Sequence, residues 1–229
     1  MSDMPQDRSP GGDPSPDARR AGVSYAALSP ADVATLARVH RAGFPGFFLS
    51  SLGAPFLRQL YAGYASDPSA LTVVARAHGR PIAAVLGTSE PAGFYGRLLR
   101  RRLTGFAIAG LRGAVRHPRA VPRLVRALRY RGDAPADRPG ALLSSIVVDP
   151  PWAGAGIGGE LMRRWLDLAA ERGVTRAYLT TDRDDNAGVH AFYAAHGWAV
   201  DAEFATPEGR AMTRYAIDLR PPATMGQRP

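Results

Sequence analysis

The residues best suited to chemistry form a glycine-rich stretch in the second half of the chain. Ala153-Gly154-Ala155-Gly156-Ile157-Gly158-Gly159 follows an apolar, β-branched run, Leu142–Val148, and leads into a segment with helical spacing, Gly156–Arg172. Glycines let a backbone adopt unusual dihedrals and approach a ligand closely. The first N–H groups of a helix lack internal partners, and the helix dipole adds partial positive charge there. The stretch therefore predicts a site for an anion such as a pyrophosphate.

The glycine-rich stretch does not match two common phosphate-binding motifs. It lacks the Gly-Lys-Ser/Thr ending of the nucleotide P-loop. It fits the dinucleotide pattern G-x-G-x-x-G only if the spacing is accepted loosely. Taken alone, the glycines are as typical of a tight strand-to-helix turn as of an anion site.

A second block of residues lies downstream. Asn186 is followed by Ala191-Phe192-Tyr193-Ala194-Ala195-His196-Gly197-Trp198. Together with the sequence Val-x-Pro and the Gly-x-Gly-Ile-Gly stretch, this block resembles the GNAT superfamily of N-acetyltransferases. The second block is similar to the family pattern Asn-x-x-x-x-x-Phe-Tyr-x-x-x-Gly-Phe, with Trp198 in place of the last Phe. The resemblance covers Val23–Leu219 and is most specific in Leu142–Trp198.

The resemblance implies roles for individual residues and acetyl-CoA as co-substrate. Backbone groups of the central strand would pair with the pantetheine arm as with an added strand. Asn186 would hydrogen-bond the pantetheine, and Tyr193 would be the general acid that protonates the departing CoA thiolate. A phenol with a pKa of about 10 is protonated at neutral pH, although simple packing beside Phe192 is the alternative. The expected cofactor-binding residues are Ile146, Val147, Val148, Ala153, Gly154, Ala155, Gly156, Ile157, Gly158, Gly159, Asn186 and Tyr193.

One position departs from the family pattern. The family usually has Arg or Gln where this chain has Ala153, and that side chain helps to hold the phosphates of the cofactor. Its absence leaves the backbone site intact but lowers the expected affinity. A nearby arginine as substitute and a loss of activity are both open interpretations.

The acceptor side is less clearly marked. The resemblance implies direct transfer without an acyl-enzyme, and the attacking amine must lose a proton to a base. Glu90, at the end of a predicted strand, is the tentative base; Ser144, Ser145 and Asp182 are alternatives, and each also fits a solvated strand end or a core hydroxyl. The aromatic stretch Phe44–Phe48 suggests a pocket wall or core packing. The expected acceptor is a primary amine of a small molecule, such as an amino sugar or a natural-product intermediate.

Composition excludes several classes of chemistry. The absence of cysteine excludes disulfides, Cys-ligated zinc and a thiol nucleophile. The five histidines show no metal-ligand spacing, so no metal is expected. Met1–Gly22 has no apolar core of a signal peptide, and no apolar run reaches the ~18 residues of a membrane span. We therefore expect a cytoplasmic protein.

The basic residues are concentrated in one segment. All 29 are arginine, and 11 of them lie in Arg97–Arg131, which has no Asp or Glu. Helical spacing over Phe94–Arg131 predicts two basic amphipathic helices with a break near His117-Pro118. Three interpretations of these helices stay open. They form a solvated face packed on the sheet or on a second subunit, they contact an anionic membrane surface, or they contact an acidic substrate. Nucleic acid is disfavoured because the segment has few aromatic residues for stacking.

These patterns predict one α/β domain with a mixed sheet, helices on both faces and the basic helical insertion (94–131) before the central strand: a GNAT-like acyl-CoA N-acyltransferase fold. The domain is expected to span 23–220, between disordered tails at 1–22 and 221–229. Besides an acetyltransferase, an acyl-CoA-binding module with little catalysis and a membrane-surface adaptor are alternatives. The expected strands are Val23–Leu28, Leu71–Ala77, Ile82–Gly87, Leu142–Val148, Thr175–Thr180, Val200–Thr206 and Met212–Leu219.

Overall fold

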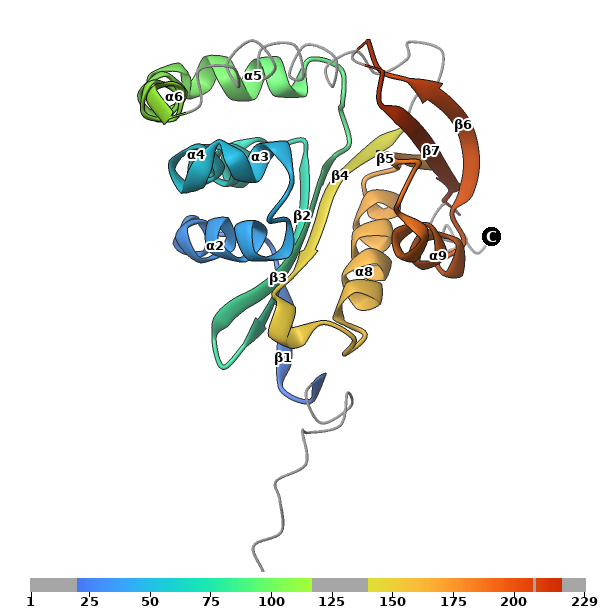
Figure 1. Ribbon diagram of the computed structural model, residues 1–229. Helices are drawn as coiled ribbons and strands as arrows, with labels where there is room; N and C mark the ends of the chain where they lie inside the picture. Colours follow the sequence, from blue (N-terminus) through green and yellow to red (C-terminus); the bar gives the residue numbers. More distant parts are fainter. Residues whose placement is uncertain (1–19, 117–139, 208, 220–229) are drawn as a thin grey trace, which may run out of the picture.

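A single seven-stranded mixed sheet organises the molecule (Figure 1). The computed structural model describes residues 20–116, 140–207 and 209–219. The strand order is β1-β2-β3-β4-β5-β7-β6, and all neighbours are antiparallel except β4 and β5. The strands are β1 (Val23–Ala26), β2 (Ala70–Ala77), β3 (Arg80–Thr88), β4 (Ala141–Val148), β5 (Arg176–Asp182), β6 (Ala199–Ala205) and β7 (Ala211–Asp218).

Helices cover both faces of the sheet, which confirms the predicted fold class (Figure 1). Helices α2 to α6 lie on one face, and α8 and α9 lie on the other. The short helix α3 was not predicted. The helices are η1 (Pro30–Asp32), α2 (Val33–Gly43), α3 (Phe48–Ser51), α4 (Gly53–Ser66), α5 (Phe94–Arg101), α6 (Leu103–Arg116), η2 (Pro150–Trp152), α8 (Ile157–Glu171) and α9 (Ala187–Ala195).

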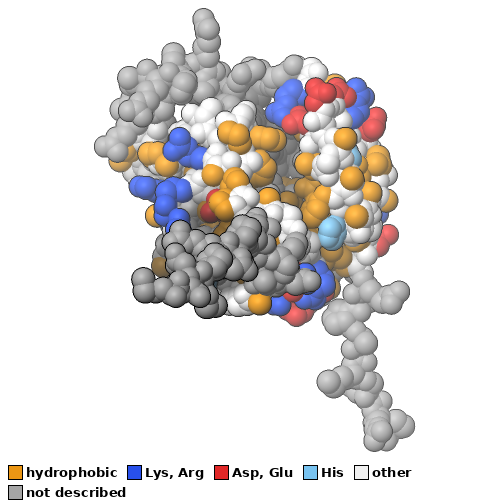
Figure 2. Space-filling view, turned by 60° about the horizontal axis from the view of Figure 1, so that its bottom comes forward, with side chains coloured by type: hydrophobic (Ala, Val, Ile, Leu, Met, Phe, Trp, Pro, Cys, Tyr) orange, Lys and Arg blue, Asp and Glu red, His pale blue; other side chains and the backbone are white. Residues whose placement is uncertain are grey.

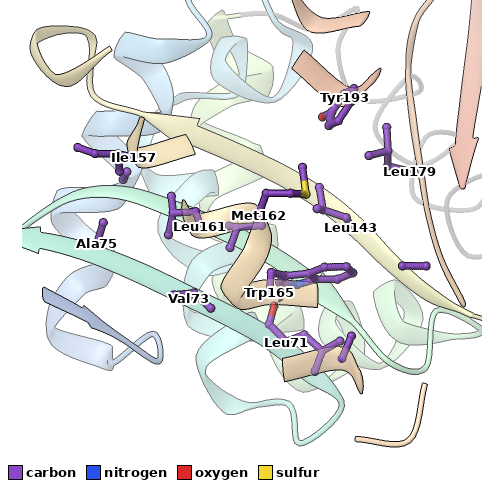
Figure 3. Close-up of a cluster of buried hydrophobic side chains, with 14 of the residues drawn as sticks. Leu71, Val73, Ala75, Leu143, Ile157, Leu161, Met162, Trp165, Leu179 and Tyr193 are labelled. Atoms are coloured by element: carbon purple, nitrogen blue, oxygen red, sulfur yellow. Dashed lines mark hydrogen bonds between the residues drawn. The ribbon is translucent and has the colours of Figure 1, made fainter. Parts of the chain in front are cut away.

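The neighbouring strands β2 and β3 are buried on both faces. Val73 and Val85 point toward α8, whereas Val74 belongs to the cluster under α2 and α4, because successive side chains of a strand alternate between faces. Trp165 of α8 is fully buried among the first group, and its indole N–H donates to the Leu71 carbonyl at 3.0 Å (Figure 3). The sheet thus fixes α8, whose first turn begins the predicted anion site.

The basic insertion differs in detail from the prediction. Its described part contains two helices, α5 and α6, separated at Arg102, a division that was not predicted; α6 ends at Arg116, and the predicted break near His117 and residues 117–131 lie outside the described residues. Arg97 and Arg101 lie 3.6 and 3.4 Å from the buried carboxylate of Asp67. Burial acts to raise the pKa of Asp67, but hydrogen bonds from Ser69 and the two arginines hold it below its ordinary value. Part of the arginine content therefore fixes α5 to the end of α4.

The predicted tails fall almost wholly outside the described residues. Only residues 20–22 of the predicted N-terminal tail are described, and they run directly into β1. The C-terminal tail at 221–229 lies outside the described ranges.

Gly87 of β3 offers a test of this packing. A Cβ at Gly87 would overlap the Leu142 carbonyl oxygen and the Trp165 ring. We expect Gly87→Ala to lower the free energy of unfolding by about 1–3 kcal/mol, the usual cost of overpacking a core, measured by urea unfolding. Gly96→Ala in α5 is the control, because its Cβ would meet nothing within 4 Å. Equal stability of the two variants would contradict this account of the core.

Candidate functional site

The strands β4 and β5 form a fork that exposes part of the β4 backbone. β4 pairs with β3 from Leu142 to Val148, but its pairing with β5 comprises only Ala141 with Ala177 and Leu142 with Tyr178. β5 pairs instead with β7 along its whole length. On the β5 side, the β4 backbone beyond Leu142 therefore has no strand partner within the described sheet. Such an edge can pair with an extended ligand, and the predicted residues Ile146, Val147 and Val148 lie on it.

The loop after β4 places a helix N-terminus beside this fork. The Asp149 N–H donates to the Ile82 carbonyl at 2.8 Å, and the turn η2 follows. Gly154 and Gly156 then adopt φ angles of 76° and 74°, which favour glycine. In the described chain, no acceptor takes a hydrogen bond from the N–H groups of Gly156, Ile157, Gly158 or Gly159. These N–H groups at the positive end of α8 form the expected anion site.

Two glycines of the loop also bring α9 close to α8. A Cβ at Gly159 would lie 2.6 Å from Nε2 of His196, and one at Gly158 would lie 3.6 Å from the Phe192 ring. The His196 ring is fixed by a hydrogen bond of 2.7 Å between its Nδ1 and the Phe192 carbonyl. Gly159 is therefore required for packing as well as being part of the expected anion site. This close contact brings the two sequence blocks of the family resemblance together in space.

Tyr193 lies on the buried side of α9, in the same apolar cluster as Leu143 of β4 and Leu179 of β5 (Figure 3). Its ring packs against Tyr215 at a centroid distance of 5.6 Å and against Trp198 at 6.2 Å. Burial, with a smaller contribution from Tyr215, raises the pKa of Tyr193 to about 12. Its hydroxyl has no hydrogen-bond partner among the residues that the structure describes. The phenol is therefore neutral at physiological pH and retains its proton for donation.

Asn186 lies between the end of β5 and the start of α9. Its amide nitrogen donates to the Thr181 hydroxyl at 2.8 Å and to the Asp182 carbonyl at 2.9 Å. These bonds fix the side chain and leave its amide oxygen as the group that can receive a ligand hydrogen bond. Asp182, an alternative base, has its carboxylate held by Arg210 at 2.6 and 2.7 Å. Both oxygens of this carboxylate are therefore already occupied by Arg210.

The tentative base Glu90 follows β3, whose last residue Thr88 pairs with Leu142 at the start of β4. The Glu90 side chain is 70% exposed, and its carboxylate lies 3.5 Å from Arg97. No hydrogen bond or ion pair within the described residues joins Glu90 to β4. Its role as a base stays a prediction.

Ser144 lies at an irregularity of β4 that the sequence did not reveal. Leu86 pairs with Ser145 and Gly87 pairs with Leu143, so Ser144 is the extra residue of a β-bulge. A hydroxyl chain leads from this bulge into the α4 and α5 layer.

The Tyr95 hydroxyl donates to Ser144 Oγ at 3.0 Å, and the Tyr64 hydroxyl lies 3.1 Å from that of Tyr95. Sequence analysis missed both tyrosines, because they come from helices far apart in the chain and no local spacing connects them.

The end of α2 forms a further wall beside β4. A Cβ at Gly43 would lie 2.7 Å from the Val147 side chain, so the residues after Gly43 begin next to the β4 edge. The rings of Phe44 and Phe47 lie 5.0 Å apart, and Phe47 is 52% exposed. Figure 2 shows a hollow on this end of the molecule with apolar side chains at its border. The exposed Phe47 fits a pocket wall, and the half-buried Phe44 also contributes to the core.

Two other features of the described ranges bear on the type of site. No three His, Asp or Glu side chains in these ranges are grouped so that they could hold a metal ion. No described helix has the length and apolarity to cross a membrane.

Comparison with known proteins identifies the family. The model of the acetyltransferase (GNAT) family matches residues 36–198, which include the fork, the loop and α9. The chain belongs to this family. No curated protein sequence matches the chain. Many solved structures do, and they share the GNAT fold at low sequence identity.

Three of the similar structures illustrate the range of the GNAT fold. A GNAT-family protein from Desulfovibrio desulfuricans is 15% identical with a TM-score of 0.59, and the match covers 86% of this chain and 99% of that one. The ribosomal-protein-S18-alanine N-acetyltransferase of Escherichia coli is 15% identical with a TM-score of 0.52, covering 90% and 99%. The yncA protein of Salmonella typhimurium, solved with acetyl-CoA, is 13% identical with a TM-score of 0.55, covering 89% and 97%.

The positive φ angle of Gly156 leads to a testable expectation. An alanine there would be held in the left-handed region, so we expect Gly156→Ala to lower the free energy of unfolding by about 1–2 kcal/mol. Gly158→Ala is the matched control, because its Cβ would make contacts of 3.6 Å or longer and its φ is not positive. Both are measured by thermal and urea unfolding. A Gly156→Ala variant as stable as Gly158→Ala would contradict the loop conformation described here.

Proposed function

We propose that this GNAT protein transfers the acetyl group of acetyl-CoA to a primary amine of a small molecule by direct attack, without an acyl-enzyme. The observation that carries the proposal is the position of the β4 edge, which runs unpaired toward the free N–H groups at the start of α8. One extended ligand with an amide-containing arm and a pyrophosphate matches both features. CoA has this chemistry, and the yncA structure contains acetyl-CoA.

The donor half of the site follows from this placement. Backbone groups of Ile146, Val147 and Val148 would bind the pantetheine arm, and the N–H groups of the Gly154–Gly159 loop would bind the pyrophosphate. The Asn186 amide oxygen would accept a hydrogen bond from a pantetheine amide. The acetyl group would then lie near the fork, within reach of the side chains that line it.

The reaction requires two proton movements. The amine nitrogen attacks the thioester carbon, the C–N bond forms, and the C–S bond breaks. Tyr193 would donate its proton to the departing sulfur. Because a free thiolate is a weaker base than a tyrosinate, transfer after the C–S bond has broken would be unfavourable. The proton would therefore move as the C–S bond breaks. The surplus proton of the amine would pass to a base, for which Glu90 remains the candidate carboxylate, or to a water held at Ser144.

The acceptor half of the site has two walls with different chemistry. Ser144 and Tyr95 supply hydroxyl groups at the β4 bulge, where they can hold an amine or a water. Phe44 and Phe47 supply an aromatic surface that suits the carbon skeleton of a small acceptor. A peptide N-terminus is the second candidate, because the similar Escherichia coli enzyme acts on the alanine of a ribosomal protein.

A partner surface is proposed on α6. Leu103 and Ile108 are 64% and 59% exposed, and Arg100 lies close by in sequence. Exposed apolar residues beside arginine suit an anionic membrane surface, with a second copy of the chain as the alternative. Sedimentation with anionic vesicles at low and high salt tests the first, and a mass measurement in solution tests the second.

The activity itself is tested by incubating the protein with acetyl-CoA and a panel of amino sugars, polyamines and short peptides. Release of CoA with formation of an N-acetyl product, detected by mass spectrometry, is the expected result for at least one small amine. Acetylation of peptides alone would replace the small-molecule proposal. Binding of acetyl-CoA without any transfer would favour an acyl-CoA-binding module.

Tyr193→Phe tests the general acid. We expect kcat to fall about 100-fold, the lower range for loss of an acid catalyst, while the Kd for acetyl-CoA changes less than about twofold. Tyr215→Phe is the matched control: it removes the hydroxyl of a neighbouring buried tyrosine, which bonds His190 at 2.8 Å, and should keep kcat within about threefold. Equal rates for the two variants would show that Tyr193 only packs in the core.

A further inference from the structure

The pyrophosphate site lacks a side-chain cation at the position where the family usually provides one. Ala153 is exposed and carries no charge. The free N–H groups of α8 and the helix dipole supply only partial positive charge against the two negative charges of a pyrophosphate. A guanidinium would add charge-assisted hydrogen bonds, for which its planar fork matches phosphate geometry.

We propose that Arg20, which precedes β1, supplies this cation and binds the pyrophosphate of acetyl-CoA in place of the side chain missing at Ala153. The inference rests on the proposed function, because it assumes that CoA occupies the loop before α8. It assigns a cofactor-binding role to a residue that the sequence places in a tail and outside both family blocks.

The geometry places the Arg20 guanidinium directly at the loop. Nη1 of Arg20 lies 3.0 Å from the position of a Cβ built on Gly156, and Cζ lies 4.0 Å from it. Arg20 also lies close enough to Tyr25 to lower the pKa of that phenol, although burial and Glu160 outweigh this effect and raise it. The distance to Gly156 places the Arg20 guanidinium beside the N-terminus of α8, and its electrostatic influence on Tyr25 agrees with this position.

Sheet topology explains how a residue so early in the chain reaches this loop. Val23, the first residue of β1, pairs with Ala77 at the end of β2. The next strand, β3, begins at the same end of the sheet. There the Ile82 carbonyl accepts the hydrogen bond from the Asp149 N–H at the start of the loop. The backbone before β1 therefore emerges at the end of the sheet where the loop begins (Figure 1).

The acidic residue nearest the start of α8 is paired with arginines of the same helix. Glu160, in the first turn of α8, lies 2.8 Å from Arg163 and 2.6 Å from Arg164. The hydrogen bond from Arg163 is the largest influence on Glu160, and together with Arg164 it lowers the pKa of that carboxyl to about 2. Arg164 also lies over the Tyr25 ring at 4.4 Å. Glu160 is therefore neutralised by its own helix, so its carboxylate opposes an anion at the start of α8 less strongly than an unpaired carboxylate would.

The test compares binding of CoA and dephospho-CoA, which lacks the 3′-phosphate, by isothermal titration calorimetry. We expect Arg20→Ala to weaken binding of both ligands equally, by roughly 10-fold or more, the usual effect of a lost hydrogen bond to a charged group. The melting temperature without ligand should not change, because Arg20 is exposed. Arg38→Ala is the charge-matched control on α2, at the opposite face of the sheet, and should bind both ligands as the unmodified chain does.

A second substitution tests replacement of one cation by the other. Ala153→Arg should restore most of the CoA affinity in the Arg20→Ala background and should add less to a chain that retains Arg20, which a double-mutant cycle measures as coupling. This comparison also identifies a purely structural role of Arg20, because an arginine at position 153 would not repair a fold defect.

Three outcomes would overturn the inference. An Arg20→Ala variant with unchanged CoA affinity would exclude the contact while leaving the proposed function intact. A loss seen with CoA but not with dephospho-CoA would move the contact to the 3′-phosphate. A complete lack of CoA binding by the unmodified chain would instead remove the proposed function, and this inference with it.

Discussion

Each strand of a β-sheet has backbone hydrogen-bonding groups along two edges. The arrangement of the candidate site depends on the part of β4 where one of these edges is unpaired. β3 pairs with one edge of β4 from Leu142 to Val148, whereas β5 pairs with the other edge only at Ala141 and Leu142. A buried unpaired edge is costly unless a ligand or water replaces the missing strand. The β4 residues beyond Leu142 are mostly half-buried, and the glycine-rich loop, Asn186 and the neutral phenol of Tyr193 lie around this open part of the strand.

The glycines at the start of α8 satisfy two requirements at once. A helix can present free N–H groups to an anion only if no side chain or neighbouring element covers its first turn. α9 packs tightly against this same turn, since His196 lies where a side chain of Gly159 would be. The close packing brings Tyr193 to the fork without covering the N–H groups at Gly156. The expected anion site and the position of the proposed acid thus depend on the same short segment.

Charge is distributed unevenly between the two halves of the site. The donor half depends on backbone dipoles, with Arg20 beside Gly156 as the proposed cation. The proposed acceptor half contains the neutral Ser144 and Tyr95 hydroxyls and the Phe47 ring, with the exposed Glu90 as the one proposed carboxylate. This division suits a reaction between a polyanionic donor and an amine that must be uncharged when it attacks. The arginines of α5, by contrast, are partly used to hold Asp67 in the fold.

Local sequence determined the elements and the donor loop, because alternation, helical spacing and glycine content act over a few residues. It placed β4 and α8 within one residue of their observed ends, and the family pattern joined Gly156 to Tyr193. It did not determine the split of the insertion at Arg102, the bulge at Ser144 or the hydroxyl chain through Tyr95, since these depend on which surfaces meet. The neighbourhood of Arg20 was likewise decided by strand pairing: only the folded sheet brings a residue from the start of the chain to a helix more than a hundred positions later.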